Sequence, residues 1–580
     1  MGHMTLIPLN NRSVLPLALL ISLILLSQIA RASIAVSDNP SSELAGVAWQ
    51  SNDDSAPWGD ANAQRGGISR QPLLHFPPNI RRIGPQTPHS FSATLENLQL
   101  PLIARHPQDS RWIPMLASRW LVNEQAMRLY FELDADARWS DGVAVTTEDI
   151  RFTLEFLTDP ATAAVWQAER LQQLISGLEV FDQQRFALVL QKPATMNSIR
   201  ELASLRPFAA HVYRNPRGWP KSFDWYPEPT TGPYYLAQLN PNAQIVLRET
   251  SDWWGRDKRY FKHRFNVRRV NLRMPDKDYS VVDLLERGEL DVIPLNTTEN
   301  WQSEQINQLS NSKRINRIQF YHQAPLPFTG LLLNANHPSL SSKSQRAAVL
   351  SALSPQTAIS ELNEAESLST DFIRRSEASD KQPNAEISVL PDELPLIYSD
   401  QQDLMFLRLL QQQAKTKGMN ILLEKVSPAK LRSALQQANY DLTWLRFSSP
   451  LDGENFLSLF HSGNGQIFIS MDAVQRFISG TGNTATAEQL FKYLQDESIF
   501  HTGYGYPYCR SASWQWLKLP KNQGTRISTD LFDPFDAVTG GLFWIDRKQR
   551  ADILAKPERG KNDDSKPHIN IQYRLNNNQL

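Results

Sequence analysis

The residues best suited to chemistry follow a short apolar stretch at residues 441–447. The next ten residues contain small polar and acidic side chains, namely Ser448, Ser449, Asp452 and Glu454. Such side chains can supply hydrogen bonds and negative charge to a bound solute. They are also typical of an ordinary turn, so the composition of this loop leaves both roles open.

Aromatic and basic side chains flank this loop in the sequence. Trp444 and Arg446 are two residues apart, so on a strand they share one face and could contact the same solute. Tyr504, Tyr506 and Tyr508 alternate with Gly and Pro, and a strand would place their rings on one face, where they suit stacking on peptide groups or sugars. Packing is the alternative role, with Trp444 in a core and the tyrosines in an ordinary strand.

Motifs for catalysis and for metal or cofactor binding are absent from the sequence. It contains no H-E-x-x-H, no paired cysteines and no histidine pair at helical spacing, so we expect no metal ion. It also lacks a P-loop, a G-x-S-x-G elbow and a G-x-G-x-x-G turn, so no cofactor is expected. We therefore expect a protein that is not an enzyme, with a hydrolase as an alternative.

The composition is that of a globular protein, with 41% hydrophobic and 21% charged residues. A chain of 580 residues is too long for one ordinary core, so two or three packed domains are expected. Lys and Arg total 60, as do Asp and Glu, so no net charge favours nucleic acid or an anionic membrane. With one cysteine, the chain has no internal disulfide bond.

The first 32 residues are typical of an export signal. Arg12 precedes an apolar run over residues 14–29, and residues 30–32 form an A-x-A cleavage pattern. A membrane anchor is the alternative, but such a run spans roughly 24 Å as a helix, less than the hydrocarbon layer of roughly 30 Å. No cysteine lies near the cleavage point, so we expect a cleaved signal and a free periplasmic protein, not a lipoprotein.

A strand, a tight turn and a capped helix are predicted in succession from residue 127 onwards. Alternating apolar residues over 127–133 predict a half-buried strand, and residues 140–142 are typical of a turn. Thr146 with Asp149 three residues later indicates a capping box at a helix start. Periodicity also predicts helices over residues 281–286 and 404–414, and strands over residues 420–426 and 441–447.

Five motifs occur in the order found in a known family. They are PMLASRW at residues 114–120, RWSDGVAVTTEDI at 138–150, TGPY at 231–234, DWWG at 252–255 and LERGELD at 285–291. This set resembles the bacterial extracellular solute-binding proteins of family 5, the oligopeptide, dipeptide and nickel binders that serve ABC importers. Residues 59–67 and the loop at 448–455 look most like the branch that takes up microcin C and murein peptides.

The resemblance implies an α/β fold, a two-lobed periplasmic binding protein of type II with an extra peripheral domain and a hinge between the lobes. The expected segments are a signal peptide at 1–32, a flexible leader at 33–60, lobe 1 at 61–95, 205–327 and 516–550, a small peripheral domain at 96–204, lobe 2 at 328–515 and a disordered tail at 551–580. Residues 328–334 resemble the family segment where the chain crosses to the second lobe, which makes Thr329 a candidate ligand contact.

By the same resemblance, the protein captures a peptide or peptide-like solute between its lobes and presents it to an inner-membrane ABC permease, acting as a monomer. In oligopeptide binders, an aspartate in the loop after residue 447 pairs with the amino terminus of the peptide. Here that position falls on Ser449. Either Asp452 or Glu454 takes over the role, or a free amino terminus is not what is recognised.

Departures from the family pattern in three loops support a second hypothesis. Loops at residues 87–91, 346–349 and 448–455 all differ from the family pattern. Altered loops around a cleft imply an altered ligand or none. The alternative is therefore a sensor or regulator that reports a ligand to a membrane partner and imports nothing.

Overall fold

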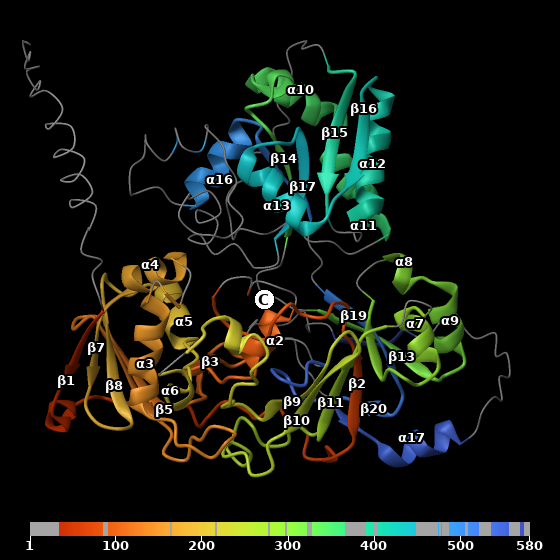
Figure 1. The fold of residues 1–580 in the computed structure, drawn as a ribbon. Helices are drawn as coiled ribbons and strands as arrows, with labels where there is room; N and C mark the ends of the chain where they lie inside the picture. The colour runs from red at the N-terminus through yellow and green to blue at the C-terminus, as the bar shows by residue number, and fades with distance from the viewer. Residues whose placement is uncertain are drawn as a thin grey trace, which may run out of the picture.

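The computed structural model describes residues 34–555 with gaps, and residues 569–573. The gaps are at 85–86, 88–90, 160, 163–164, 215–216, 276–278, 296–297, 322–327, 366–389, 400–402, 448–473, 475–476, 478–486, 505–507 and 521–534. The described residues form a larger and a smaller body, each with its own sheets (Figure 1). The predicted export signal lies outside the described residues.

One end of the larger body is a peripheral sheet with the strand order β1-β7-β8-β6-β5. Its strands are β1 (Ala35–Asp38), β5 (Ala117–Asn123), β6 (Arg128–Leu133), β7 (Ile175–Val180) and β8 (Arg185–Leu190). The helices beside it are α3 (Thr147–Thr158), α4 (Val165–Leu174), α5 (Met196–Ala203) and α6 (Ala210–Tyr213). The leader expected over residues 33–60 differs from the structure, because β1 pairs in parallel with β7. Its sequence AVSD has no apolar periodicity, so only the distant partner strand reveals it.

The rest of the larger body contains two four-stranded sheets, with the orders β2-β11-β10-β9 and β12-β19-β13-β22. The first comprises β2 (Ile68–Pro72), β9 (Tyr234–Asn240), β10 (Gln244–Glu249) and β11 (Arg269–Arg273). The second comprises β12 (Val292–Pro294), β13 (Ile315–Tyr321), β19 (Tyr508–Trp514) and β22 (Ile569–Tyr573). Short pairs are β3 (Ile103–Arg105) with β4 (Trp112–Pro114), and β20 (Leu517–Lys518) with β21 (Trp544–Ile545). The helices are α2 (Ser92–Asn97), α7 (Val281–Glu286), α8 (Thr298–Trp301), α9 (Glu304–Asn311) and α17 (Arg547–Leu554), with 3-10 turns η1 (Ser41–Leu44) and η2 (Lys221–Phe223).

The smaller body is a sheet with the order β16-β15-β17-β14-β18 and helices on both faces. Its strands are β14 (Phe328–Leu333), β15 (Glu393–Tyr398), β16 (Asn420–Lys425), β17 (Leu442–Phe447) and β18 (Phe500–Thr502). Its helices are η3 (Pro338–Leu340), α10 (Lys343–Leu353), α11 (Pro355–Ala365), α12 (Leu404–Thr416), α13 (Pro428–Gln437) and α16 (Ala487–Asp496). One core packs α10, α11 and α12 on one face, and a second packs α13 and α16 on the other. A sheet covered on both faces is typical of α/β folds.

Two expected boundaries differ from the structure. The second lobe was expected to extend to residue 515, but β19 already pairs with β12 and β13 in the larger body. The expected disordered tail over 551–580 includes β22, which pairs in parallel with β13. Both strands join β12 and β13, which lie almost two hundred residues or more before them in the chain. The local sequence therefore does not reveal this pairing.

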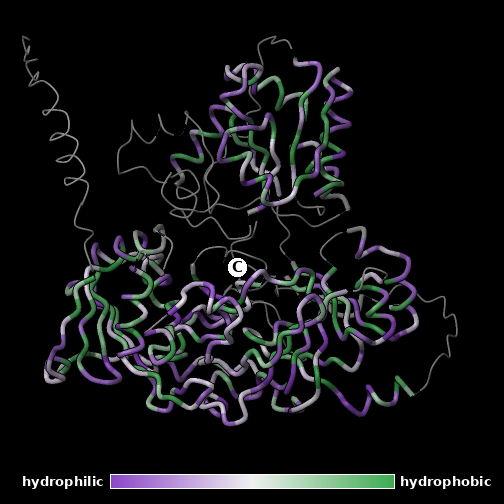
Figure 2. The backbone as a smooth tube through the Cα atoms, in the orientation of Figure 1, coloured by the Kyte–Doolittle hydropathy of each residue, from purple (hydrophilic) through white to green (hydrophobic). Residues whose placement is uncertain are grey.

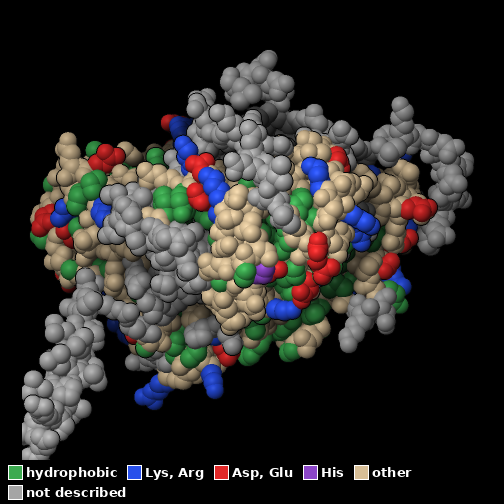
Figure 3. Space-filling model, turned by 90° about the horizontal axis from the view of Figure 1, so that it is seen from above, with side chains coloured by type: hydrophobic (Ala, Val, Ile, Leu, Met, Phe, Trp, Pro, Cys, Tyr) green, Lys and Arg blue, Asp and Glu red, His purple; other side chains and the backbone are tan. Residues whose placement is uncertain are grey.

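Hydrophobic residues concentrate in the strands of both bodies, and hydrophilic ones on the outer helices and loops (Figure 2). On the face seen from above, acidic and basic side chains are interspersed (Figure 3). This mixture matches the equal numbers of acidic and basic residues. Among the described residues, no helix has the length and apolar character needed to cross a membrane.

Candidate ligand-binding site

The chain passes between the two bodies twice, from β13 to β14 and from β18 back to β19. Strand β14 starts opposite the end of β17, with Phe328 paired to Phe447, and β18 ends near the same edge, with Thr502 opposite Gly330. The carboxyl end of β15 also lies there, because β15 runs parallel to β17. In α/β sheets, ligands bind at the carboxyl ends of such strands. We call this edge of the smaller body the crossing edge (Figure 1).

A buried aspartate lies at the centre of the crossing edge. Asp403 is fully buried at the start of α12. It occupies the N-cap position, yet its carboxylate makes no capping bond to the helix. The carboxylate instead accepts hydrogen bonds from the Tyr504 hydroxyl at 2.9 Å and from the guanidinium of Arg446, which also forms an ion pair with it. A buried carboxylate requires such partners, because burying an unpaired charge is very costly.

The backbone of Tyr504 is fixed by a threonine at the start of β14. Thr329 Oγ donates to the Tyr504 carbonyl oxygen at 2.8 Å and accepts from the Tyr504 backbone N–H at 2.9 Å. Gly503, just before it, packs tightly, since a Cβ there would lie 2.4 Å from Thr329 Oγ and 2.5 Å from the Trp444 ring. Thr329 therefore holds the backbone of Tyr504, while the Tyr504 hydroxyl donates to Asp403.

Trp444 completes the cluster as a packed ring. It is 2% exposed, and its ring centroid lies 4.7 Å from that of Phe406 and 6.1 Å from that of Tyr504. Its indole N–H is buried and has no hydrogen-bond partner among the described residues. The packing role, left open by the sequence, accounts for the position of the ring but leaves that N–H unexplained.

Four of the nine predicted site residues lie together at the crossing edge. Thr329, Trp444 and Tyr504 are buried, whereas the Arg446 side chain is 21% exposed. The other five lie outside the described residues: Ser448, Ser449, Asp452, Glu454 and Tyr506. Their roles stay predictions. Sequence reasoning missed Asp403, whose partners Arg446 and Tyr504 lie 43 and 101 residues away along the chain.

The expected row of tyrosines is divided between the two bodies. Tyr504 packs in a core of the smaller body, while Tyr508 begins β19 in the larger body. The return crossing therefore lies between them. Tyr504 and Tyr508 therefore do not share one strand face.

The larger body presents basic groups near the same crossings. Strand β13 ends there and strand β19 begins there, with Tyr321 paired to Tyr508. A short distance along these strands, Arg317 and Arg510 approach the Trp301 ring, with guanidinium carbons 4.1 and 4.8 Å from its centroid. Burial and the neighbouring Arg510 charge lower the pKa of Arg317.

Neutral oxygen atoms bind these arginines. Arg317 donates to the Trp301 carbonyl oxygen at 2.6 Å and to Asn307 Oδ at 2.8 Å, and Arg510 donates to Gln319 Oε at 2.8 Å. The two bodies thus differ at the crossings, with a buried acid in one and stacked guanidinium groups in the other.

The motif residues of the larger body are structural. Trp139 is buried and approaches Asp149, whose carboxylate accepts from the Thr146 backbone N–H at 2.9 Å in the expected capping position. Trp253 and Trp254 both donate to the Thr231 carbonyl oxygen, at 2.9 and 3.1 Å. These contacts join elements of the larger body.

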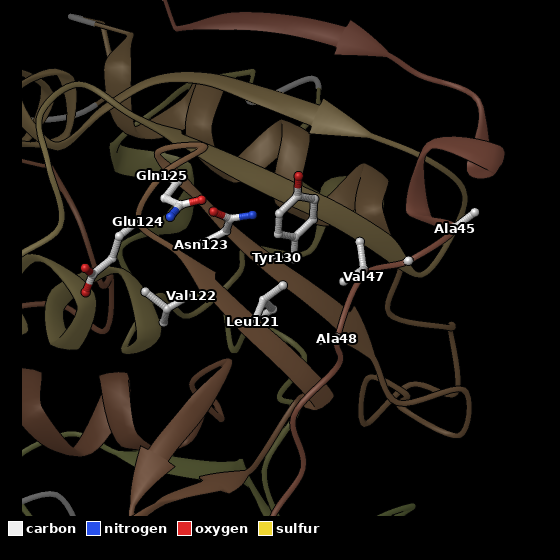
Figure 4. Close-up of a pocket in the computed structure, with 10 residues that line it drawn as sticks. Ala45, Val47, Ala48, Leu121, Val122, Asn123, Glu124, Gln125 and Tyr130 are labelled. Atoms are coloured by element: carbon white, nitrogen blue, oxygen red, sulfur yellow. The ribbon is translucent and has the colours of Figure 1, made fainter.

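A groove of about 650 Å³ lies away from the crossings, at the outer edge of the peripheral sheet. Figure 4 shows Tyr130 between residues 45–48 and the turn residues Asn123 and Gln125. Burial raises the pKa of Tyr130. No predicted site residue lines this groove. Among the described residues, no three His, Cys, Asp or Glu side chains gather to hold a metal ion.

Comparison with known proteins identifies similar sequences and folds. Residues 111–387 match the family model of bacterial extracellular solute-binding proteins, family 5 Middle. A binding protein of Brucella melitensis is 20% identical over 236 residues, which is 40% of this chain and 38% of that protein. The match thus spans less than half of the relative's length.

Solved structures agree over most of the chain. The oligopeptide-binding protein AppA of Bacillus subtilis, in complex with a nonapeptide, superimposes with a TM-score of 0.59 at 14% identity, covering 84% of this chain and 100% of that one. The murein tripeptide binding protein MppA of Escherichia coli gives 0.58 at 14% identity, covering 83% and 98%. These likenesses confirm the two-lobed α/β fold. The match over residues 111–387 and the five family motifs support the resemblance to the bacterial extracellular solute-binding proteins of family 5.

Proposed function

We propose that the protein is a periplasmic substrate-binding protein of an ABC importer, which captures a peptide or peptide-like solute between its two bodies. The observation that carries the proposal is the pair of crossings at one edge of the smaller body. Two bodies joined in this way can rotate about the crossings and close over a solute. A closed form stabilised by ligand is what a permease would recognise.

Arg446 is the described residue best placed to contact the solute. It lies at the crossing edge, is partly exposed and is paired with buried Asp403. The buried hydroxyl of Tyr504 holds the same carboxylate, so the guanidinium is fixed in position before any ligand arrives. A guanidinium in fixed orientation binds carboxylate and carbonyl oxygens well. The loop that starts at Ser448, two residues after Arg446, carries the other predicted contacts.

The relatives support one class of solute. AppA binds a nonapeptide and MppA a murein tripeptide, and the loop at 448–455 resembles the branch that takes up microcin C and murein peptides. We infer that a murein-derived or short peptide is the solute. The protein acts as a monomer, without cofactor and without catalysing a reaction on its ligand.

Calorimetric titration of the mature protein with murein tripeptide and with short-peptide pools tests this function. We expect binding, a higher melting temperature and altered tryptophan fluorescence. Arg446→Gln should weaken affinity about tenfold, since a hydrogen bond to a charged group is lost. The control is Arg432→Gln, which removes an exposed arginine on α13 of the same body and should leave affinity unchanged.

Two outcomes would contradict the proposal. One is the absence of binding with every pool at millimolar concentration, and the other is cleavage of the peptides during incubation, which would indicate a hydrolase. Uptake of labelled tripeptide by cells with and without the gene then tests delivery to a permease. Binding without any effect on uptake would favour the sensor hypothesis.

A further inference from the structure

Two loops of the larger body bring large apolar side chains together at the surface. Leu74 lies in the loop after β2 and is 57% exposed, while Trp225 and Tyr226 lie in the loop after η2 and are 47% and 42% exposed. Phe76 of the first loop stacks on Trp225, with ring centroids 5.9 Å apart and 30° between the ring planes. We call these four residues the aromatic platform.

Hydrogen bonds fix the two loops to each other beneath the platform. The Ile80 backbone N–H donates to the Asp224 carbonyl oxygen at 2.8 Å. Arg81 Nε donates to the Asp224 carboxylate at 2.7 Å, and the two side chains form an ion pair. Because Asp224 directly precedes Trp225 in the chain, these bonds hold the exposed indole ring in place.

The platform also rests on two hydrophobic cores. Phe76 packs against the main core of the larger body. The Tyr226 ring lies edge-on to Phe223 at 5.7 Å, and Phe223 packs against a second core that includes Phe156 and Tyr213. Exposed apolar side chains on a rigid support are typical of a binding surface.

The platform lies on the side of the larger body that faces the smaller body. The chain from β2 to α2, which carries Leu74 and Phe76, runs along that side (Figure 1). Strand β13 ends on the same side, where the chain leaves for the smaller body. A solute held between the two bodies would therefore meet Arg446 of the crossing edge on one side and the platform on the other.

The side chains of the platform favour one kind of ligand group. Three aromatic rings and one aliphatic side chain present a surface that is largely apolar. A large apolar side chain is removed from water when it covers such a surface, and an aromatic one gains further from stacking on the rings. A methyl group gains much less, because it buries little area.

We propose that the aromatic platform binds a large apolar side chain of the captured peptide. The platform thereby sets the preference among peptides, while Arg446 contacts their polar groups. This inference rests on the proposed function, since it requires a peptide between the two bodies. It adds the class of side chain that such a peptide carries.

The test is calorimetric titration of the mature protein with trialanine and with the three tripeptides in which one alanine is replaced by phenylalanine. All four have the same length and charge. We expect at least one phenylalanine peptide to bind about tenfold more tightly than trialanine, because its ring is buried on the platform. Equal affinities for all four would overturn the platform and leave the proposed function intact. Absence of binding for all four would contradict both.

Variants locate the preference at the platform. Trp225→Ala should weaken the tightest phenylalanine peptide about tenfold and trialanine much less, because trialanine offers the ring only a methyl group. Trp225→Phe retains a ring and should retain most of the preference. The control Leu554→Ala removes a 46% exposed side chain on α17, on the side away from the smaller body (Figure 1), and should change neither affinity. A preference that persists in Trp225→Ala, or that falls equally in Leu554→Ala, would overturn the proposal.

Discussion

Two buried aspartates, one in each body, use the same chemistry for different ends. Asp291 in the larger body and Asp403 in the smaller body are both fully buried. Asp291 accepts from the Trp516 indole N–H at 2.8 Å and pairs with Arg70. Asp403 accepts from the Tyr504 hydroxyl and pairs with Arg446. Each thus combines an arginine with an aromatic donor.

The two aspartates differ in where their hydrogen-bond and ion-pair partners lie in the fold. Asp291 also accepts from the Arg70 backbone N–H at 2.7 Å, and so ties β2 to the start of β12 inside one body. Asp403 contacts side chains from β17 and from the segment after β18, next to the crossings. We infer that Asp291 maintains the fold, while Asp403 positions a binding residue at the hinge.

The largest expected effect is the loss of stability in Asp291→Ala. The change leaves the Trp516 N–H and the Arg70 backbone N–H buried without their acceptor, and breaking a buried charge pair costs about 3–5 kcal/mol. Urea unfolding of the mature protein measures it. Asp257→Ala, at an exposed position, is the control and should change little. A cost below about 1 kcal/mol would remove the structural role assigned to Asp291.

Asp403→Asn should separate binding from stability. The amide keeps the size of the side chain but loses the ion pair with Arg446, so the free energy of unfolding should fall by about 1–3 kcal/mol. Peptide affinity should fall by about tenfold, because Arg446 is no longer held in place. Calorimetry and urea unfolding on the same sample measure both. Full affinity with reduced stability would show that Asp403, like Asp291, only maintains the fold. That result would contradict the role of Asp403 in positioning Arg446.

Trp444→Phe sharpens the interpretation of the crossing edge. It removes an indole N–H that has no partner among the described residues, which offsets part of the lost packing. We expect a change in unfolding free energy of about 1 kcal/mol, seen as a small shift in the urea midpoint. Weaker peptide binding in this variant would show that the solute accepts this hydrogen bond. A cost like that of Asp291→Ala would indicate purely structural packing.

The pH dependence of stability should carry a small signature of Asp291. Burial raises its pKa, offset in part by Arg70 and Trp516. A raised native pKa means that the stability contributed by this group is present at low pH and is lost as pH rises through the native value. Asp291→Asn removes the titration of this carboxyl group. The difference in unfolding free energy between the variant and the unmodified protein should therefore shift in favour of the variant as pH rises from below 3.8. A difference independent of pH would contradict the raised pKa.

Local structure was well predicted where a pattern is contained within one element. The helix expected at residues 281–286 is α7, and the strand expected at 441–447 is β17. Both follow from apolar periodicity and from a turn residue at one end, such as Gly288 with its positive φ of 70°.

Long-range pairing accounts for what the sequence did not reveal. Strand β1 (AVSD) contains little apolar pattern, and the alternation in β22 (INIQY) covers only five residues, so neither sequence identifies the distant strand with which it pairs. Asp403 looked like one more polar residue before a helix, because its partners come from segments far along the chain. Four of the nine predicted site residues, Thr329, Trp444, Arg446 and Tyr504, meet at one edge for the same reason, since they lie on or beside strands that the fold brings together.

Closure of the two bodies on a solute is the central claim, and small-angle X-ray scattering tests it most directly. Murein tripeptide is added to the mature protein at a concentration that calorimetry shows to be saturating. We predict a smaller radius of gyration with the tripeptide than without it. The decrease should be smaller for Asp403→Asn at the same tripeptide concentration, because its affinity is expected to be about tenfold weaker. Saturated binding with an unchanged radius of gyration would contradict a hinged binding protein.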